Sequence, residues 1–375
     1  MKYYLIAGEA SGDLHGSNLM AELVATDNEA DFRFWGGDLM AKYGGEPVKH
    51  YKQLAFMGFV KVLFNLKTIL KNIKYCKSDI AKYKPDVIIL IDYAGFNLKI
   101  AEFAHKNNFK VYYYISPKIW AWKTDRIKKI KKYVDRMFTI LPFETEFYHS
   151  HNYKVDYVGN PINDAIANWK SEQKTFENFI KEFSLPNKPI VSLLAGSRKQ
   201  EIKLMLPMMI EVSKFFPDYQ FIIAGAPGVD HELYQSIIGE IDIPIIYNQT
   251  YQILSQSNAA LVTSGTATLE TGLLNIPQVV CYHTNIGNLL FKIGWFFIKV
   301  KWISLVNLIL NHEAIKELVQ STFKKEYIVE ELDLILNNEM YRKNMLENYA
   351  ELKKRIGDPG ASKKAANLIY NALKE

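Results

Sequence analysis

The sequence predicts an α/β fold with two facing, doubly wound parallel-sheet domains of the Rossmann type. Three observations lead to this prediction. Short apolar runs rich in β-branched and aromatic residues alternate with longer segments of helical periodicity. This alternation occurs twice along the chain, once in each half. The 375 residues, 49% of them hydrophobic, are also more than one ordinary core accommodates, so two domains are expected.

Ten apolar runs are the predicted strands. They cover residues 3–7, 86–91, 111–115, 137–140 and 155–158 in the first half, and 189–194, 219–224, 244–247, 259–263 and 278–282 in the second. Continuous rather than alternating apolar runs are typical of parallel strands that helices cover on both faces.

The domain boundary is expected just after the GNP of residues 159–161. We assign residues 1–165 to the first domain and residues 166–344 to the second. The polar, helical tail of residues 345–375 is interpreted as a segment that packs back on the first domain.

Charge and cysteine content narrow the class of protein. With 46 basic and 40 acidic residues, the net charge of +6 fits anionic partners such as phosphates, nucleotides or acidic lipids. Cys76 and Cys281 lack the spacing of a metal site or a disulfide framework, which favours a reducing compartment. We expect neither a cleaved signal nor a membrane-spanning helix, because no run of about 18 uncharged apolar residues occurs.

The loop GEASGDLHG, residues 8–16, follows the first predicted strand. Its glycines lie four residues apart, whereas a dinucleotide-binding loop spaces them two and then three residues apart. We therefore interpret the loop as an acceptor-side wall whose small residues allow close approach. Its expected contributors are Glu9, Ser11, Gly12 and Asp13, with Asp13 a candidate for contact with a hydroxyl group.

Asp92 directly follows the predicted strand 86–91 and is the candidate general base. Ligands of doubly wound folds bind beyond the carboxyl ends of the strands, so this carboxylate is expected in the crevice. A helix cap or a structural hydrogen bond is the alternative role. Asn97 and Trp120 are placed on the same acceptor side, and core packing is the alternative for Trp120.

Two turns in the second half predict a site for a nucleoside diphosphate. AGSR follows the strand 189–194 and combines backbone N–H groups with the charged fork of Arg198. SGTATLE follows the strand 259–263 and opens a helix whose free N–H groups favour a diphosphate. A surface turn and an ordinary helix cap are the alternatives. The expected donor-binding residues are Gly196, Ser197, Arg198, Ser264, Gly265, Thr266, Ala267, Thr268 and Glu270, with Glu270 on the ribose.

No metal ion and no other cofactor is expected. The chain has no D-x-D triplet, the usual means of holding a divalent ion on the diphosphate of a nucleotide-sugar. Arg198 and the helix N-termini would instead meet the charge of the leaving group.

Residues 56–75 have the pattern of a helix lying in an anionic membrane interface. Lysines flank an apolar face, which includes the expected membrane contacts Phe59, Val62, Leu63, Leu66 and Leu70. Residues 289–303 show a similar pattern, and an amphipathic core helix is the alternative for both segments.

These residues together resemble the lipid-A-disaccharide synthase family, inverting glycosyltransferases of the GT-B type. The matching stretches are GEASGD (8–13), GGD (36–38), MGF (57–59), IDYAGFN (91–97), YYISPKIWAWKTDRI (113–127), LPFE (141–144), VGNP (158–161), LAGSR (194–198), SGTATLE (264–270) and SLVNL (304–308). They cover most of the chain in order, and GEASGD, the WAW segment and SGTATLE are highly specific in combination.

The resemblance implies two Rossmann-like domains with the active site in the cleft between them. It implies transfer of 2,3-diacylglucosamine from its UDP derivative to 2,3-diacylglucosamine 1-phosphate, which yields the β-1′,6-linked lipid A disaccharide 1-phosphate and UDP. Asp92 would act on the acceptor 6-hydroxyl, Arg198 on the departing UDP, and Asn307 would add a donor contact. The implied location is cytoplasmic, on the inner face of the cytoplasmic membrane. No nucleic-acid partner is implied, and a homodimer is one expectation.

The chain departs from the family pattern in a few places. The frequent IDAPDFN reads IDYAGFN here, so Gly95 replaces a second carboxylate while Asp92 is retained. The alternatives are another membrane-associated GT-B transferase, such as a peptidoglycan N-acetylglucosaminyl transferase, a UDP-sugar epimerase, and a non-enzymatic peripheral protein that binds lipid or nucleic acid.

Overall fold

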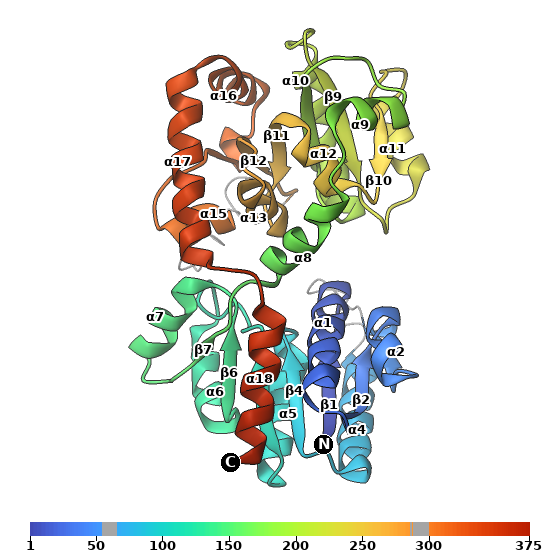
Figure 1. Cartoon of the computed structure of the whole chain (residues 1–375), viewed down its shortest axis with the longest axis vertical. Coiled ribbons are helices and arrows are strands. Elements are labelled where there is room, and N and C mark those ends of the chain that lie inside the picture. The colour runs from blue at the N-terminus through green and yellow to red at the C-terminus, as the bar shows by residue number, and fades with distance from the viewer. Residues whose placement is uncertain (55–65, 286, 288–299) are drawn as a thin grey trace. The chain divides into compact units, whose positions relative to one another are not determined.

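The computed structural model describes residues 1–54, 66–285, 287 and 300–375. The chain divides into two compact units (Figure 1). Unit 1 contains Met1–Asp164 and Asp358–Glu375, and unit 2 contains Ala165–Gly357. Each unit is built around a parallel sheet, so the predicted α/β class with two parallel sheets is confirmed.

The sheet of unit 1 has the strand order β3-β2-β1-β4-β5-β6-β7, with parallel pairing throughout. Its strands are β1 (Lys2–Ala7), β2 (Asp31–Gly36), β3 (Lys49–His50), β4 (Val87–Ile91), β5 (Lys110–Tyr114), β6 (Arg136–Thr139) and β7 (Asp156–Tyr157). The chain runs outward in one direction from β1 and in the other from β4. These two neighbouring strands therefore form the topological switch point, where doubly wound folds bind their ligands.

Helices cover both faces of this sheet (Figure 1). Apolar residues of α4 (Leu66–Tyr83), α5 (Ala94–Lys106) and α6 (Ile127–Tyr133) join one buried cluster. Residues of α1 (Ala10–Thr26), α2 (Asp38–Gly44) and α18 (Ala361–Lys374) join the cluster on the other face. One further helix, α7 (Pro142–Ser150), follows β6. The buried β1 and β4 lie between the two clusters, which explains their continuous apolar sequences.

The last helix, α18, returns to unit 1 and packs against α1. The carboxylate of Asp164 accepts hydrogen bonds from the N–H groups of Gly360 (2.6 Å), Ala361 (3.2 Å) and Ser362 (3.3 Å). It thereby satisfies N–H groups at the start of α18 that have no intrahelical partner. The return begins at Asp358 rather than at residue 345, because α17 (Glu339–Ile356) belongs to unit 2.

The sheet of unit 2 has the order β10-β9-β8-β11-β12-β13, and its pairs are again parallel. Its strands are β8 (Ile190–Leu194), β9 (Gln220–Gly225), β10 (Ile245–Tyr247), β11 (Ser257–Thr263), β12 (Gln278–Tyr282) and β13 (Glu317–Val319). Besides α17, the described part of unit 2 contains the helices α8 (Pro161–Trp169, which starts in unit 1), α9 (Phe176–Glu182), α10 (Lys199–Ser213), α11 (His231–Ile238), α12 (Thr250–Ser255), α13 (Thr266–Leu273), α15 (Leu305–Leu310) and α16 (Lys325–Asn337). The switch point of this sheet lies between β8 and β11.

All ten predicted strands occur, with ends shifted by at most two residues. The sequence interpretation missed β2, β3 and β13. Polar residues interrupt these strands, and β3 and β13 are also short and lie at the sheet edges.

Candidate active site

Two of the predicted motifs meet at the switch point of unit 1. Gly8 and Glu9 follow β1, and Asp92 and Tyr93 follow β4. A Cβ atom on Gly8 would lie 2.4 Å from the ring of Tyr93, so only glycine allows this approach. Burial raises the pKa of Tyr93, and the negative charge of Glu9 raises it further.

Asp92 lies in a turn whose backbone is unusual. Asp92 and Tyr93 have φ angles of 42° and 47°, in the left-handed region that residues other than glycine rarely adopt. The side chain of Asn97 donates from Nδ2 to the carbonyl oxygens of Asp92 (2.9 Å) and Ile91 (3.2 Å), and the Tyr113 hydroxyl also donates to the Asp92 carbonyl. These bonds hold the strained turn in place. The N-cap of α5 is Tyr93, so Asp92 is not the capping residue.

The environment of Asp92 suits a base. Burial raises the pKa of Asp92, while the charge of Lys118 and the N–H of Tyr93 oppose the rise. A raised carboxylate pKa brings the group closer to proton transfer near neutral pH.

Asp13 has a different position from the one we expected. Its carboxylate accepts hydrogen bonds from the N–H groups of Gly37 (2.7 Å), Leu39 (3.1 Å) and Met40 (3.2 Å), at the start of α2. It is only 3% exposed. This side chain joins the GEASGD loop to the GGD turn, so its carboxylate serves the backbone rather than a hydroxyl ligand.

The other predicted site residues of this loop differ in their solvent exposure. Ser11 is exposed beside half-buried Glu9. Gly12 is buried, and a Cβ there would lie 3.1 Å from the Cβ of Ala7, so it allows α1 to pack closely on β1.

His15 is a residue that the sequence interpretation left out, although it lies within GEASGDLHG. Burial lowers its pKa to about 4, and the charge of Asp164 partly opposes this. Its Nδ1 atom is buried without a hydrogen-bond partner among the described residues. The imidazole of His15, on α1, is therefore neutral near pH 7.

Trp120 is held by Glu144, another residue that the sequence interpretation did not assign to the site. The indole Nε1 donates to Glu144 Oε1 (3.1 Å), and Glu144 Oε2 accepts from the N–H groups of Ile140 (3.2 Å) and Leu141 (3.0 Å). Phe143 packs edge-on against the indole at 4.9 Å between ring centroids. Trp120 is buried, as the packing alternative predicts. Glu144 is the last residue of the LPFE motif (141–144), so the motif could have pointed to it.

In unit 2, the AGSR turn follows β8 and precedes α10. The N–H of Ser197 donates to Glu201 Oε2 (3.2 Å), and Arg198 Nη1 donates to Glu201 Oε1 (3.0 Å). Gly196 has a φ of 109°, a conformation that favours glycine. Arg198 is exposed, so its guanidinium is accessible to an anion.

The SGTATLE segment follows β11 on the other side of this switch point. The Ser264 hydroxyl donates to the carbonyl of Ile303 (3.0 Å), and the Thr268 hydroxyl donates to the carbonyl of Gly265 (2.8 Å). These two hydroxyl groups therefore hold the loop. Gly265 and Thr266 are exposed, Ala267 is half-buried, and the first N–H groups of α13 have no partner within the helix. Backbone donors thus remain at this turn for an anion.

Glu270 and Asn307 differ in how their polar groups are used. The Tyr251 hydroxyl donates to Glu270 Oε1 (2.8 Å). Burial raises the pKa of Glu270, and this hydrogen bond lowers it.

Asn307 is 0% exposed, donates to Glu317 Oε1 (2.9 Å) and accepts from the N–H of Ala314 (2.8 Å). The amide of Asn307 therefore supports the loop, in place of the donor contact that the resemblance implied.

The predicted membrane contacts are only partly described. Phe59, Val62 and Leu63 lie outside the described residues. On α4, Leu66 and Leu70 are 47% and 51% exposed. Within the described residues, no helix is both long enough and apolar enough to cross a membrane, and no three His, Cys, Asp or Glu side chains cluster as metal ligands would.

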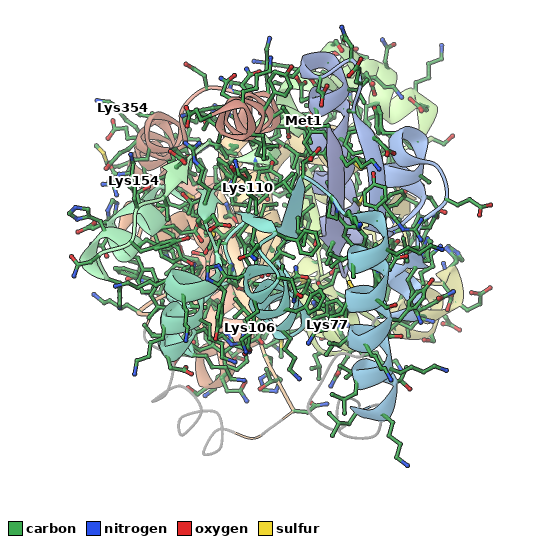
Figure 2. All side chains as sticks on the ribbon, turned by 90° about the horizontal axis from the view of Figure 1, so that it is seen from below. Met1, Lys77, Lys106, Lys110, Lys154 and Lys354 are labelled. Atoms are coloured by element: carbon green, nitrogen blue, oxygen red, sulfur yellow. The ribbon has the colours of Figure 1, made fainter. Side chains whose placement is uncertain are left out.

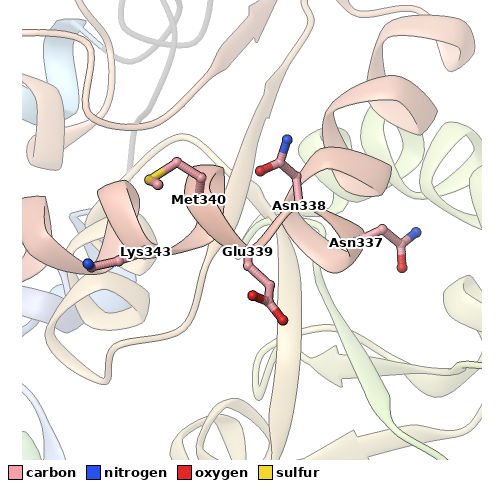
Figure 3. A pocket seen from close by; sticks show the side chains of 5 residues that line it. All are labelled: Asn337, Asn338, Glu339, Met340 and Lys343. Carbon is pink, nitrogen blue, oxygen red and sulfur yellow. The ribbon is translucent and has the colours of Figure 1, made fainter.

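A surface pocket lies at the junction of α16 and α17 in unit 2. Figure 3 shows its lining side chains, Asn337, Asn338, Glu339, Met340 and Lys343, pointing in different directions. Asn338 accepts a hydrogen bond from the N–H of Tyr341 and caps α17. This pocket contains none of the predicted site residues.

The family model described as LpxB, lipid-A-disaccharide synthetase, matches residues 3–369. The chain belongs to the lipid-A-disaccharide synthase family. Its members are glycosyltransferases of lipid A biosynthesis. Both switch points lie within the matched residues.

Curated relatives are similar in sequence to this chain over nearly its full length. The lipid-A-disaccharide synthases of Coxiella burnetii (strain CbuG_Q212) and Syntrophus aciditrophicus (strain SB) are 35% and 36% identical to this chain. The first match covers 98% of each chain, and the second covers 99% of this chain and 97% of the relative.

Solved structures with the same fold include enzymes that use nucleotide-sugars. UDP-GlcNAc 2-epimerase from Neisseria meningitidis, bound to UDP-GlcNAc, matches with a TM-score of 0.69, 14% identity and coverage of 100% of both chains. The calicheamicin glycosyltransferase CalG4 matches with a TM-score of 0.61, 10% identity and coverage of 100% of this chain and 98% of that one. At this low identity the matches establish a GT-B-like fold for this lipid-A-disaccharide synthase family member.

Proposed function

We propose that this protein transfers 2,3-diacylglucosamine from its UDP derivative to the 6-hydroxyl of 2,3-diacylglucosamine 1-phosphate. The observation that carries this proposal is the set of residues found at the two switch points. One presents a carboxylate on a strained turn, and the other presents Arg198 and the start of α13. A base and an anion-binding cradle are the two functions that an inverting transfer needs.

In the proposed reaction, the carboxylate of Asp92 takes the proton of the acceptor hydroxyl. The oxygen then forms a bond to the anomeric carbon while the bond from that carbon to the diphosphate oxygen breaks. UDP leaves with the electron pair, and the configuration at the anomeric carbon inverts. Arg198 and the N–H groups of Gly265, Thr266 and Ala267 stabilise the charge that develops on UDP.

The remaining residues position these groups. Asn97 holds the Asp92 turn, Asp13 joins two acceptor-side loops, and Glu144 fixes Trp120. Glu9 and Ser11 are the more accessible acceptor-side groups, and Glu270 is assigned to the ribose. Asn307 is assigned to loop support.

A lipid surface is the proposed place of action, on the inner face of the cytoplasmic membrane. Helices α4, α5 and α6 share one face of the sheet of unit 1. The hydrogen bond from Lys106 lowers the pKa of Glu102 on α5, and the charges of Lys129 on α6 and Lys77 on α4 lower it further. Figure 2 labels Lys77 and Lys106 among the side chains of this region. A basic face beside the exposed Leu66 and Leu70 suits anionic lipid head groups. A homodimer, expected from the resemblance, is tested by sedimentation of the purified protein.

A second candidate is epimerisation of a UDP-sugar, because UDP-GlcNAc 2-epimerase shares the fold. The two activities separate in one assay, in which the purified protein receives the UDP-diacylglucosamine donor with and without acceptor. The proposed transferase releases UDP in proportion to acceptor. Conversion of the donor to a stereoisomer without acceptor would support the epimerase instead.

A further inference from the structure

Glu201, on the first turn of α10, contacts both anion-binding groups of the AGSR turn. One carboxylate oxygen accepts from the Ser197 N–H (3.2 Å), and the other accepts from Arg198 Nη1 (3.0 Å). A backbone N–H and a guanidinium are the donors that a phosphate oxygen would also use. The carboxylate thus binds where the proposed function requires a diphosphate.

Gly196 makes this contact possible. A Cβ atom at residue 196 would lie 2.7 Å from Glu201 Oε2 and 2.8 Å from Glu201 Cβ, so a side chain there would displace the carboxylate. Tyr282, at the end of β12, responds to the charges of the same pair. Burial raises the pKa of Tyr282, the charge of Glu201 raises it further, and Arg198 lowers it. The contact itself joins the AGSR turn to the first turn of α10.

We propose that Glu201 is an internal competitor for the donor site, which keeps UDP binding weak enough for the product to leave. This inference rests on the proposed function of Arg198. The ion pair is partly exposed, and such pairs are weak, so a diphosphate can displace the carboxylate. The displaced carboxylate remains close to the diphosphate and repels it, since both are negative.

Competition and simple positioning predict opposite results when the charge is removed. If Glu201 only oriented Arg198, its loss would leave the guanidinium mobile, and UDP would bind more weakly. If Glu201 competes, its loss frees both donors and removes a repulsive charge. UDP would then bind more tightly and leave more slowly.

The test is calorimetric titration of the full-length protein with UDP, comparing wild type, Glu201→Gln and Glu211→Gln. Glu211 is the matched control, because it lies on the same helix and forms an exposed ion pair with Lys214 three residues away. We expect Kd to fall about fivefold for Glu201→Gln, the effect of one nearby charge in water, and to stay unchanged for Glu211→Gln. In steady-state turnover, KM for the donor and kcat should both fall. Equal or weaker UDP binding by Glu201→Gln would overturn the inference.

Two further variants separate the possible failures. Glu201→Ala, expected to bind UDP more tightly as well, decides the question if the glutamine variant does not fold. Arg198→Ala tests the proposed function itself. If wild type does not bind UDP, the proposed function fails. A different pattern rejects only the competitor inference. In that pattern wild type binds UDP, Arg198→Ala does not bind it, and Glu201→Gln binds it with the affinity of wild type.

Discussion

The side-chain amide of Asn97 donates a hydrogen bond of 2.9 Å to the backbone carbonyl of Asp92. This bond crosses the turn in which Asp92 and Tyr93 both have positive φ angles. Because such a backbone costs free energy, it persists only where its surroundings hold it. The position of the candidate base is therefore set by a buried amide five residues further along the chain.

Substitution of Asn97 by Ala should release this turn. We expect kcat to fall at least tenfold with a smaller change in KM, because Asp92 loses its position, and the free energy of unfolding to fall by about 1–3 kcal/mol. Steady-state kinetics and urea titration measure the two effects. Tyr113→Phe removes only the second hydrogen bond to the same carbonyl and should have the milder effect on kcat. A fully active Asn97→Ala variant would show that the turn needs no such support.

Substitution of Asp92 by Asn should lower kcat by about 100-fold or more, the usual contribution of a positioned base. UDP affinity, measured by calorimetry, should stay near that of wild type, because the donor cradle belongs to unit 2. Near-normal turnover would remove Asp92 from its assigned role.

The pH dependence of kcat/KM should report the same carboxylate. Burial raises the pKa of Asp92 above its ordinary value of 3.8, and the base must be ionised to accept a proton. Activity should therefore fall as pH is lowered through this raised pKa. The residual activity of Asp92→Asn should lack that acidic limb, and an unchanged limb would assign it to another group.

Glu144 should give unit 1 a pH-dependent stability. Burial raises its pKa from an ordinary 4.5 to about 7, although the N–H groups of Leu141, Trp120 and Ile140 oppose the rise. At pH values between 4.5 and about 7, Glu144 is protonated in the folded protein but ionised in the unfolded chain. Stability from this group is thus complete below pH 4.5 and is lost as pH rises to about 7. The loss is on the order of 3 kcal/mol, at about 1.4 kcal/mol per pKa unit.

Urea titration of wild type and Glu144→Gln at a series of pH values measures this contribution. The variant keeps an acceptor oxygen for Trp120 but cannot titrate, so its stability should decline less between pH 4.5 and 7. Parallel curves for the two proteins would contradict the assignment.

Replacement of Leu66 and Leu70 by Ser should weaken binding to vesicles that contain anionic lipid, because these side chains are exposed beside the basic face. Co-sedimentation measures the bound fraction, and we expect it to fall severalfold. Val24→Ser on α1 is the control, since Val24 is also exposed, at 43%, but lies on the other face of the sheet. Equal losses for the two proteins would place the lipid contact elsewhere.

The sequence predicted the fold well where physical patterns are strong. Continuous apolar runs such as VIILI of β4 can satisfy parallel pairing and burial together, so their strands were found. β2 was missed because its Arg33 and Asp31 look like surface residues, yet Arg33 pairs with Asp79 of α4. Pairing between distant segments cannot be read from local periodicity.

The candidate site was predicted less completely. Asp92 and Arg198 could be assigned to the candidate site because the loops after parallel strands lie at one edge of the sheet. The roles of Asp13, Thr268 and Asn307 were not predicted, because each polar side chain binds backbone groups brought near by the fold. A sequence shows that a polar group is present, but not whether it faces a ligand or the chain itself.

The most direct test of the account is mass spectrometry of the lipid formed from UDP-2,3-diacylglucosamine and 2,3-diacylglucosamine 1-phosphate by the purified protein. We predict one new species, the tetraacylated disaccharide 1-phosphate, formed in equal amount to released UDP and strongly reduced for Asp92→Asn and Arg198→Ala. Absence of this disaccharide with wild type, or undiminished formation by both variants, would contradict the account.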